Sequence, residues 1–230
     1  MKVLMLSSSK YAEHDYLAYA KEWIVEHLTA AKTLIFIPYA GVSISWDEYT
    51  QKVQDALPMY QVKGIHQFKD PVLAIKEAEG ILVGGGNTFN LLHQLYKNAL
   101  LSPIQASVKL GTPYIGWSAG SNICGQSIRT TNDMPIIEPA SFNALHFLSA
   151  QLNPHYTDYV APHHHGETRD QRIEEFCVLH PKTPVIAIRE GTALLIRDNK
   201  LSLLGELNSF VFIGPNKLEI TSQQDLTEYL

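Results

Sequence analysis

A glycine-rich pentapeptide in the middle of the chain has the pattern of a nucleophilic serine turn. Residues 116–120 read GWSAG, which matches G-x-S-x-G. They follow the short apolar segment Pro113-Tyr114-Ile115 and precede Asn122-Ile123, where we expect a helix to begin. In such a strand–turn–helix setting the turn lifts the serine hydroxyl above the sheet, and the glycines leave room for the tight backbone. Ser118 is therefore the candidate nucleophile; the alternative is an ordinary glycine-rich turn.

A serine nucleophile needs hydrogen-bond donors for the oxyanion that forms during acyl transfer. The backbone amide of Ala119, at the start of the expected helix, is one candidate. A second glycine-rich segment, residues 84–87 with the sequence GGGN, follows another expected strand, at the sheet edge where α/β proteins bind ligands. Gly86 N–H is the second candidate, and Asn87 either caps the next helix or contacts substrate. The segment matches neither a Walker motif nor GxGxxG, and a plain turn with a helix cap remains the alternative.

The serine also requires a general base, and that base requires an acidic residue that orients it. His155 follows a proline, where we expect a loop to present it, but spacing alone does not distinguish it among the ten histidines. Glu190 ends the apolar segment Val185–Ile188, and Asp133 lies in a polar segment. Either carboxylate could hold the imidazole in the correct tautomer, and either could be a plain turn or surface residue.

Two further groups of reactive side chains are given structural interpretations. The run His163–His165 is interpreted as a solvated polar loop, because adjacent residues of an extended chain point to opposite sides and rarely converge on one metal. We therefore expect no metal there, and chemistry at a serine nucleophile needs neither a metal nor an organic cofactor. Cys124 and Cys177 lie far apart in the sequence, which favours two buried thiols in a reducing compartment over a disulfide framework.

The first half of the chain alternates strand and helix patterns, which predicts a mostly parallel sheet covered by helices on both faces. The expected strands are apolar runs bounded by glycine, proline or polar residues: Val3–Leu6, Thr33–Ile37, Gln61–Ile65, Ile81–Val83 and Pro113–Gly116. The expected helices are Tyr16–Leu28, Asp47–Leu57, Pro71–Ala78, Leu91–Lys97 and Pro103–Lys109.

The second half has a different pattern. Residues 126–142 are polar and irregular, and Arg169–Leu179 has helical spacing. Short apolar segments then follow one another with tight turns, which predicts a C-terminal antiparallel extension of the sheet: Val185–Ile188, Ala193–Ile196, Leu201–Leu204 and Phe210–Ile213. No linker or repeat interrupts the chain, so we expect residues 1–230 to form a single α/β domain.

The bulk composition excludes several classes of function. The chain has 230 residues, 45% of them hydrophobic and 18% charged, with a formal net charge of −5. An acidic chain offers no broad basic surface for nucleic acid or for an anionic membrane. No apolar run is long enough to span a bilayer, and the N-terminal run of four apolar residues is too short for a signal peptide. We expect a cytoplasmic enzyme or binding protein.

Several longer segments carry a resemblance to a known family. They are FIP at 36–38, WDEYT at 46–50, VGGGNTF at 83–89, YIGWSAG at 114–120, IRTTNDMPI at 128–136, NPH at 153–155 and GETR at 166–169. In these segments, in this order, the chain resembles the peptidase E family of serine peptidases, the aspartyl dipeptidases, over nearly its whole length. The resemblance implies a class I glutaminase-like, flavodoxin-like fold.

The resemblance also implies roles for individual residues. Ser118 would be the nucleophile, His155 the base and Glu190 the acid, with Asp133 either the alternative acid or a ligand of the substrate ammonium. Arg169 would bind the aspartate side chain, because a planar guanidinium pairs bidentately with a carboxylate. Without the resemblance, Arg169 would be interpreted as a solvated residue at a helix start. The histidine run before Gly166 departs from the family pattern and would change the rim of the pocket.

The expected activity is hydrolysis of dipeptides with a free N-terminal L-aspartate, through an acyl-enzyme on Ser118. One alternative is a related serine hydrolase of another aspartyl substrate, as cyanophycinases are. The other is a non-catalytic homologue that binds a ligand without turnover. The expected partner is a small peptide, with no nucleic acid and no membrane, and the protein is expected to be a monomer or a homodimer.

Overall fold

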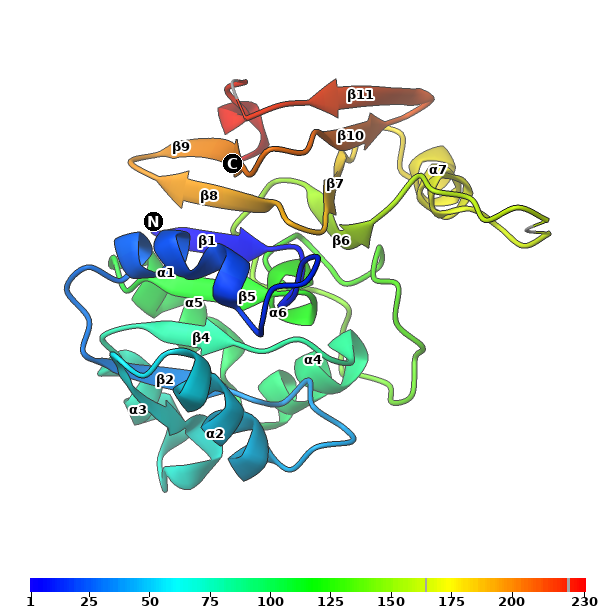
Figure 1. Cartoon of the computed structure of the whole chain (residues 1–230). Helices are drawn as coiled ribbons and strands as arrows, with labels where there is room; N and C mark the ends of the chain where they lie inside the picture. The colour runs from blue at the N-terminus through cyan, green and yellow to red at the C-terminus, as the bar shows by residue number, and fades with distance from the viewer. Residues whose placement is uncertain (164, 223) are drawn as a thin grey trace.

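The computed structural model describes residues 1–163, 165–222 and 224–230 (Figure 1). The larger of its two sheets has the strand order β3-β2-β4-β5-β1-β8-β9. The first five strands in this order are parallel, and β8 and β9 are antiparallel additions at the β1 edge. Their bounds are β1 Val3–Leu6, β2 Thr33–Ile37, β3 Gln61–Gly64, β4 Ile81–Val83, β5 Tyr114–Trp117, β8 Ala193–Arg197 and β9 Lys200–Leu204.

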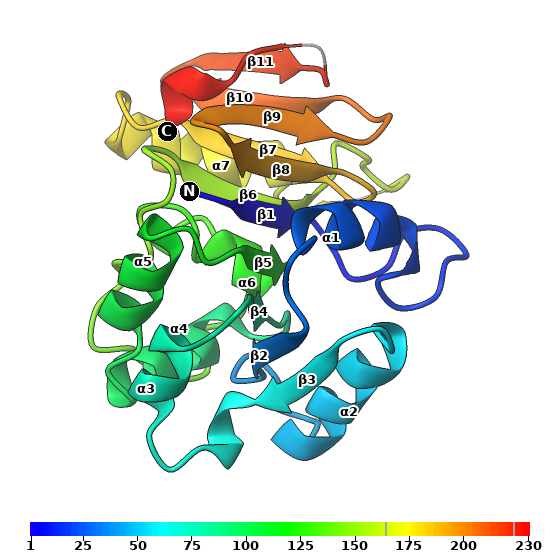
Figure 2. The ribbon, with the colours of Figure 1, turned by 90° about the vertical axis from the view of Figure 1, so that its left-hand side faces the viewer.

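Helices cover both faces of this sheet, as the sequence predicts (Figure 2). Successive residues of a strand point to opposite faces, so Leu4 packs with the layer of α1 and α2, and Met5 with the layer of α3, α4 and α5. The bounds are α1 Lys21–His27, α2 Trp46–Ala56, α3 Pro71–Lys76, α4 Thr88–Lys97 and α5 Leu101–Lys109.

Among helices α1 to α5, two begin three or more residues away from the expected start, and capping and backbone conformation explain both. The expected helix from Tyr16 begins only at Lys21 after a short 3₁₀ turn, because Leu17 adopts a left-handed conformation with φ 61°. Helix α4 begins three residues earlier than expected, at Thr88, because the side chain of Asn87 accepts a hydrogen bond from Asn90 N–H and caps it.

The second sheet was not expected. It has four strands in the order β11-β10-β7-β6, with β6 (Gln151–Tyr156) parallel to β7 (Val185–Arg189), and β10 (Ser209–Ile213) and β11 (Asn216–Ile220) antiparallel. The expected antiparallel extension is therefore divided: β8 and β9 extend the first sheet, whereas β7 and β10 belong to the second. Helix α7 (Arg169–Leu179) packs on this second sheet through Ile173 and Cys177.

Strands β6 and β11 were not predicted from the sequence, because their composition is unlike that of a buried strand. Strand β6 contains a proline and polar residues, and most of β11 is exposed. Both lie at edges of the second sheet, where proline and polar side chains are tolerated.

Cys124 and Cys177 are buried free thiols, as predicted. Within the described ranges, no helix combines the length and the apolar character needed to cross a membrane.

Candidate active site

Ser118 lies in a strained turn between β5 and the short helix α6 (Ala119–Asn122). Its backbone has φ 54° and ψ −112°, a conformation that is costly for a residue with a side chain and typical of a nucleophile elbow. The helix begins directly after the serine, at Ala119, and not at Asn122 as expected. A Cβ at Gly120 would lie 2.2 Å from the carbonyl oxygen of Val83, so only glycine permits this close approach.

Two backbone amides beside Ser118 remain available as donors. Within the described part of the chain, neither Gly86 N–H nor Ala119 N–H donates a backbone hydrogen bond, the latter because it opens a helix. Gly86 has φ +135°, and a Cβ there would lie 2.2 Å from the carbonyl oxygen of Ala40. The glycine loop can therefore bring an unpaired N–H to the cavity beside Ser118. Asn87 lines the same cavity, and its amide donates to the carbonyl of Met134 at 2.9 Å.

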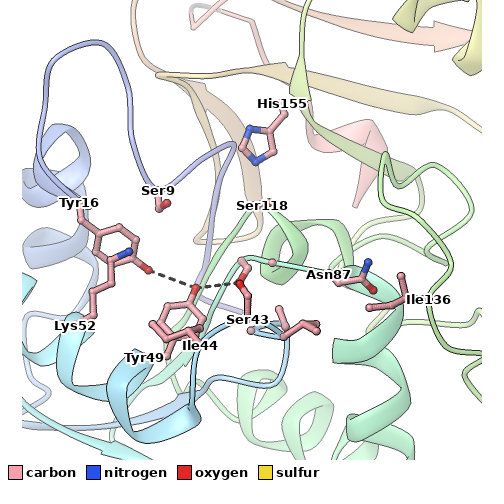
Figure 3. Close-up of a pocket in the computed structure, with 15 residues that line it drawn as sticks. Ser9, Tyr16, Ser43, Ile44, Tyr49, Lys52, Asn87, Ser118, Ile136 and His155 are labelled. Atoms are coloured by element: carbon pink, nitrogen blue, oxygen red, sulfur yellow. Dashed lines mark hydrogen bonds between the residues drawn. The ribbon is translucent and has the colours of Figure 1, made fainter.

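His155 lies on β6, and not in a loop as expected. A β-bulge interrupts the pairing of β6 with β7 between Asn153 and Tyr156, and His155 has φ 55°. A bulge re-aims the side chain that it carries. The imidazole extends from its strand toward Ser118 across a shared cavity (Figure 3). Among the described residues Ser118 Oγ makes no hydrogen bond, so it is not joined to the imidazole in this structure.

The carboxylate that contacts His155 is Glu190, at the end of β7: Oε1 lies 2.6 Å from His155 Nδ1. Both side chains are partly exposed. Asp133 makes its contacts elsewhere. Its Oδ2 accepts from the backbone N–H and the hydroxyl of Thr88 at 2.7 and 2.6 Å, and from the hydroxyl of Thr131 at 3.2 Å. Asp133 therefore sits at the positive N-terminal end of α4.

Arg169 is the first residue of α7 and is half-buried. No described residue forms an ion pair or a hydrogen bond with its guanidinium. Burial first, and then the neighbouring charge of Arg172, lower the pKa of this guanidinium below its usual value, while Asp133 opposes the shift. An unpaired, partly desolvated cation is a binding position for an anion.

Two cavities share Ser118 and His155 in their lining. The smaller, about 130 Å³, is lined also by Arg169, Asp133 and Asn122, and it brings the candidate substrate-binding charges next to the serine. No described donor reaches Asp133 Oδ1, so that oxygen remains available. The larger cavity, about 490 Å³, lies between the glycine loop and residues of α2, and Tyr16, Ile44, Tyr49 and Lys52 form its far side (Figure 3).

Sequence reasoning missed two residues that support the site. Tyr49 donates from Oη to the carbonyl of Gly85 at 2.9 Å, and its oxygen accepts from Tyr16 Oη at 3.4 Å (Figure 3). The same oxygen also accepts from Trp117 Nε1 at 3.2 Å. Ser7 is fully buried at the end of β1 and contacts His155. The position of Ser7 directly after a strand was a usable signal, since ligand sites gather at that sheet edge. Tyr49 lies in the segment WDEYT that carries the family resemblance, but nothing in the sequence indicated its role.

The structure describes only part of the histidine run. His163 and His165 belong to the described residues, and His164 lies outside them. Among the described side chains, no group of three or more His, Cys, Asp or Glu residues could hold a metal ion.

The chain is similar to known proteins over nearly its whole length. The sequence pattern of peptidase family S51 matches residues 3–204. The chain is 54% identical to a protein named peptidase E from Shewanella baltica (strain OS185), with 100% of this chain and 98% of that protein covered. It is 51% identical to peptidase E from Shewanella amazonensis, with 100% and 99% covered.

Two solved structures share the fold. One is described as a putative peptidase E protein from Listeria monocytogenes EGD-e, with a TM-score of 0.65 and 22% identity over 89% of this chain and 98% of that one. The other is a peptidase from an acI-B1 Actinobacterium, with a TM-score of 0.71 and 18% identity over 98% and 96%. At these identities the likeness concerns the fold alone.

Proposed function

Because the chain belongs to peptidase family S51 and is a serine peptidase, we propose a specific activity for it. The proposed activity is that of a dipeptidase specific for a free N-terminal L-aspartate. Ser118 is the proposed nucleophile, His155 the base and Glu190 the residue that orients the imidazole. Gly86 and Ala119 supply the proposed oxyanion donors. Arg169 and Asp133 bind the aspartyl residue of the substrate.

The observation that carries the aspartate specificity is the unpaired, half-buried guanidinium of Arg169 in the small cavity beside Ser118. A substrate carboxylate would supply its missing partner. Asparagine has the same shape but no charge, so it would leave the half-buried cation unpaired, and such mismatches discriminate between substrates. Glutamate carries its carboxylate one methylene farther from the scissile bond, so pairing with Arg169 would shift the reacting carbonyl away from Ser118. The free Oδ1 of Asp133 supports binding of the substrate ammonium.

The proposed reaction proceeds in two halves. Ser118 Oγ attacks the peptide carbonyl while His155 Nε2 takes the hydroxyl proton, and His155 Nδ1–H donates to Glu190. Gly86 and Ala119 N–H groups stabilise the oxyanion, and each such donor is worth roughly 3–4 kcal/mol. His155 then gives its proton to the leaving amine, which departs as an amino acid. Water, deprotonated by His155, hydrolyses the aspartyl ester and regenerates Ser118.

The proposal is tested by hydrolysis of Asp-Leu, Glu-Leu and Asn-Leu by the wild type and by Ser118→Ala. We expect the wild type to cleave Asp-Leu and to cleave Glu-Leu and Asn-Leu only very slowly. We expect the variant to lose several orders of magnitude in kcat while keeping its fold. Retained activity in Ser118→Ala would remove the nucleophile assignment. A wild type that cleaves none of the three dipeptides, but cleaves an aspartyl polymer, would favour the alternative of a related serine hydrolase.

A further inference from the structure

We propose that the larger cavity binds the leaving residue of the dipeptide and that Lys52 pairs with its free C-terminal carboxylate. This inference rests on the proposed function, because it takes the small cavity as the site of the aspartyl residue. A peptide whose scissile carbonyl lies at Ser118 must place its two halves on either side of that atom. With the aspartyl half beside Arg169, the amine half enters the other cavity that Ser118 and His155 line.

The charges of the two cavities differ in a way that suits the two halves of a dipeptide. The small cavity carries both a cation, Arg169, and an anion, Asp133, and an aspartyl residue presents a carboxylate and an ammonium. Among the described residues that line the larger cavity, Lys52 is the only lysine or arginine, and no carboxylate is present. The leaving amino acid of a dipeptide presents one free anion, its carboxylate, and no free cation before cleavage. Each cavity therefore offers charges opposite to those of the half of the dipeptide that it would bind.

Lys52 is positioned by the same helix that holds the glycine loop. It follows Tyr49 by three residues on α2, so the two side chains lie on the same face, and both reach the larger cavity (Figure 3). Its Nζ lies 4.4 Å from the centroid of the Tyr16 ring, on the cavity wall. This contact holds the ammonium near the cavity without neutralising its charge.

No described carboxylate neutralises Lys52, although acidic residues lie near it on the outer face of α2. None forms an ion pair with Lys52 within 4.0 Å. Glu48 accepts hydrogen bonds from the hydroxyl and backbone N–H of Ser45 at 2.7 and 3.1 Å, as part of a capping box. Asp55 accepts from the side chain of Gln51 at 2.7 Å. These carboxylates are already held by other partners, so the ammonium remains open to a ligand.

The side chain of the leaving residue would contact an apolar wall of the larger cavity. Val42, Ile44 and the ring of Tyr16 give the cavity an apolar wall, and a medium-sized apolar residue such as leucine would bury its side chain there. A longer peptide would carry its terminal carboxylate about 3.5 Å farther away for each added residue. Lys52 therefore gives the site a preference for a dipeptide over longer chains and over blocked C-termini.

The test compares Asp-Leu with Asp-Leu amide, which lacks only the terminal charge. The enzymes are the wild type, Lys52→Met, Lys52→Arg and, as a matched control, Lys76→Met, an exposed helical lysine on α3 outside both cavities. Since Lys52 is exposed, we expect the wild type to prefer the free carboxylate by roughly five- to tenfold in kcat/KM, mostly through KM. Lys52→Met should bring this preference close to one, whereas Lys52→Arg and Lys76→Met should keep it.

The outcomes separate this inference from the function on which it rests. If the wild type cleaves neither substrate, the proposed function fails and the carboxylate assignment fails with it. If the wild type cleaves Asp-Leu and Lys52→Met keeps the full preference over the amide, only the assignment to Lys52 is overturned. The same conclusion follows if Lys52→Met slows both substrates equally, because the lost interaction then does not involve the terminal charge.

Discussion

The backbone N–H of His155 donates a 2.9 Å hydrogen bond to the hydroxyl of Ser7, a residue 148 positions earlier in the chain. Ser7 Oγ in turn donates to the carbonyl of Ile188 on β7 at 2.8 Å. The preceding residue, Leu6, accepts from Ser118 N–H at 3.2 Å. The end of β1 therefore contacts both the serine turn of one sheet and the histidine strand of the other, and it sets the separation between them.

Ser7→Ala should impair catalysis without impairing substrate binding. The change leaves the N–H of His155 and the carbonyl of Ile188 without their partner, so the imidazole loses its position above Ser118. We expect kcat for Asp-Leu to fall by roughly 10- to 100-fold with KM within about twofold, since small misplacements of a reacting group have effects of this size. Steady-state kinetics measures both.

Ser107→Ala is the matched control for this prediction. Ser107 is also a buried serine whose hydroxyl donates to a backbone carbonyl, that of Ile75, at 3.2 Å, but it lies on α5 away from the site. Each variant should lose about 1 kcal/mol of stability. Equal losses of kcat in the two variants would contradict a positioning role for Ser7.

Tyr49→Phe should lower kcat because Tyr49 orients the glycine loop. In a trans peptide the carbonyl of Gly85 and the N–H of Gly86 point in opposite directions, so a hydroxyl that holds the carbonyl also directs the N–H away from Tyr49. Burial is the main cause that raises the pKa of Tyr49, so the hydroxyl stays protonated and donates at neutral pH. We expect a fall in kcat of roughly tenfold, a fraction of the loss when a donor is removed outright.

Tyr96→Phe controls for the loss of a tyrosine hydroxyl as such. Tyr96 Oη donates to the carbonyl of Asn143 at 3.0 Å, outside both cavities. This variant should keep the kcat of the wild type. A Tyr49→Phe enzyme with unchanged kcat would show that the glycine loop keeps its orientation without the hydroxyl.

Arg169→Met should remove the preference for aspartate over asparagine at the first residue. The guanidinium is the unpaired cation of the small cavity, so its loss should lower kcat/KM for Asp-Leu by roughly 100-fold or more, with little effect on the slow cleavage of Asn-Leu. Arg172→Met is the control, because Arg172 lies on the same helix and has Glu167 at 3.5 Å. If Arg169→Met keeps the wild-type ratio of kcat/KM for Asp-Leu to kcat/KM for Asn-Leu, another residue binds the substrate carboxylate.

His27 should make the stability of the protein depend on pH. Burial first, and then the charge of Arg197, lower the pKa of His27 from 6.5 to about 4, although the backbone of Lys2 and Tyr114 offsets part of the shift. Between these two values the unfolded chain binds a proton that the folded chain excludes. Stability is therefore highest above pH 6.5 and falls as the pH decreases toward 4.

The measurement is the free energy of unfolding in urea at pH 7.5 and pH 5. The wild type should lose about 2 kcal/mol more between these pH values than His27→Leu, in which the titrating group is replaced by an apolar one. Parallel losses in both proteins would mean that carboxyl groups, and not His27, determine the acid sensitivity.

The sequence by itself determined those elements that depend on local chemistry. Strands β1, β2 and β4 have the predicted bounds, because each is a short apolar run ended by polar residues, proline or glycine. The turn at Ser118 was recognisable because backbone contacts 2.2–2.3 Å from a would-be Cβ at Gly116 and Gly120 restrict both positions to glycine. Such constraints act on neighbouring residues, so they leave a pattern in the sequence.

Only the tertiary structure decided which distant groups meet. The sequence left open whether Glu190 or Asp133 contacts His155. The pairing of β6 with β7 brings Glu190 to the imidazole, although the two residues are 35 positions apart in the chain. Asp133 is held elsewhere by hydrogen bonds from Thr88 and Thr131. The division of the C-terminal strands between two sheets likewise could not be predicted from the sequence. Strand pairing uses backbone groups that every residue carries, so partners far apart in the chain are selected by packing and by hydrogen-bond satisfaction in three dimensions.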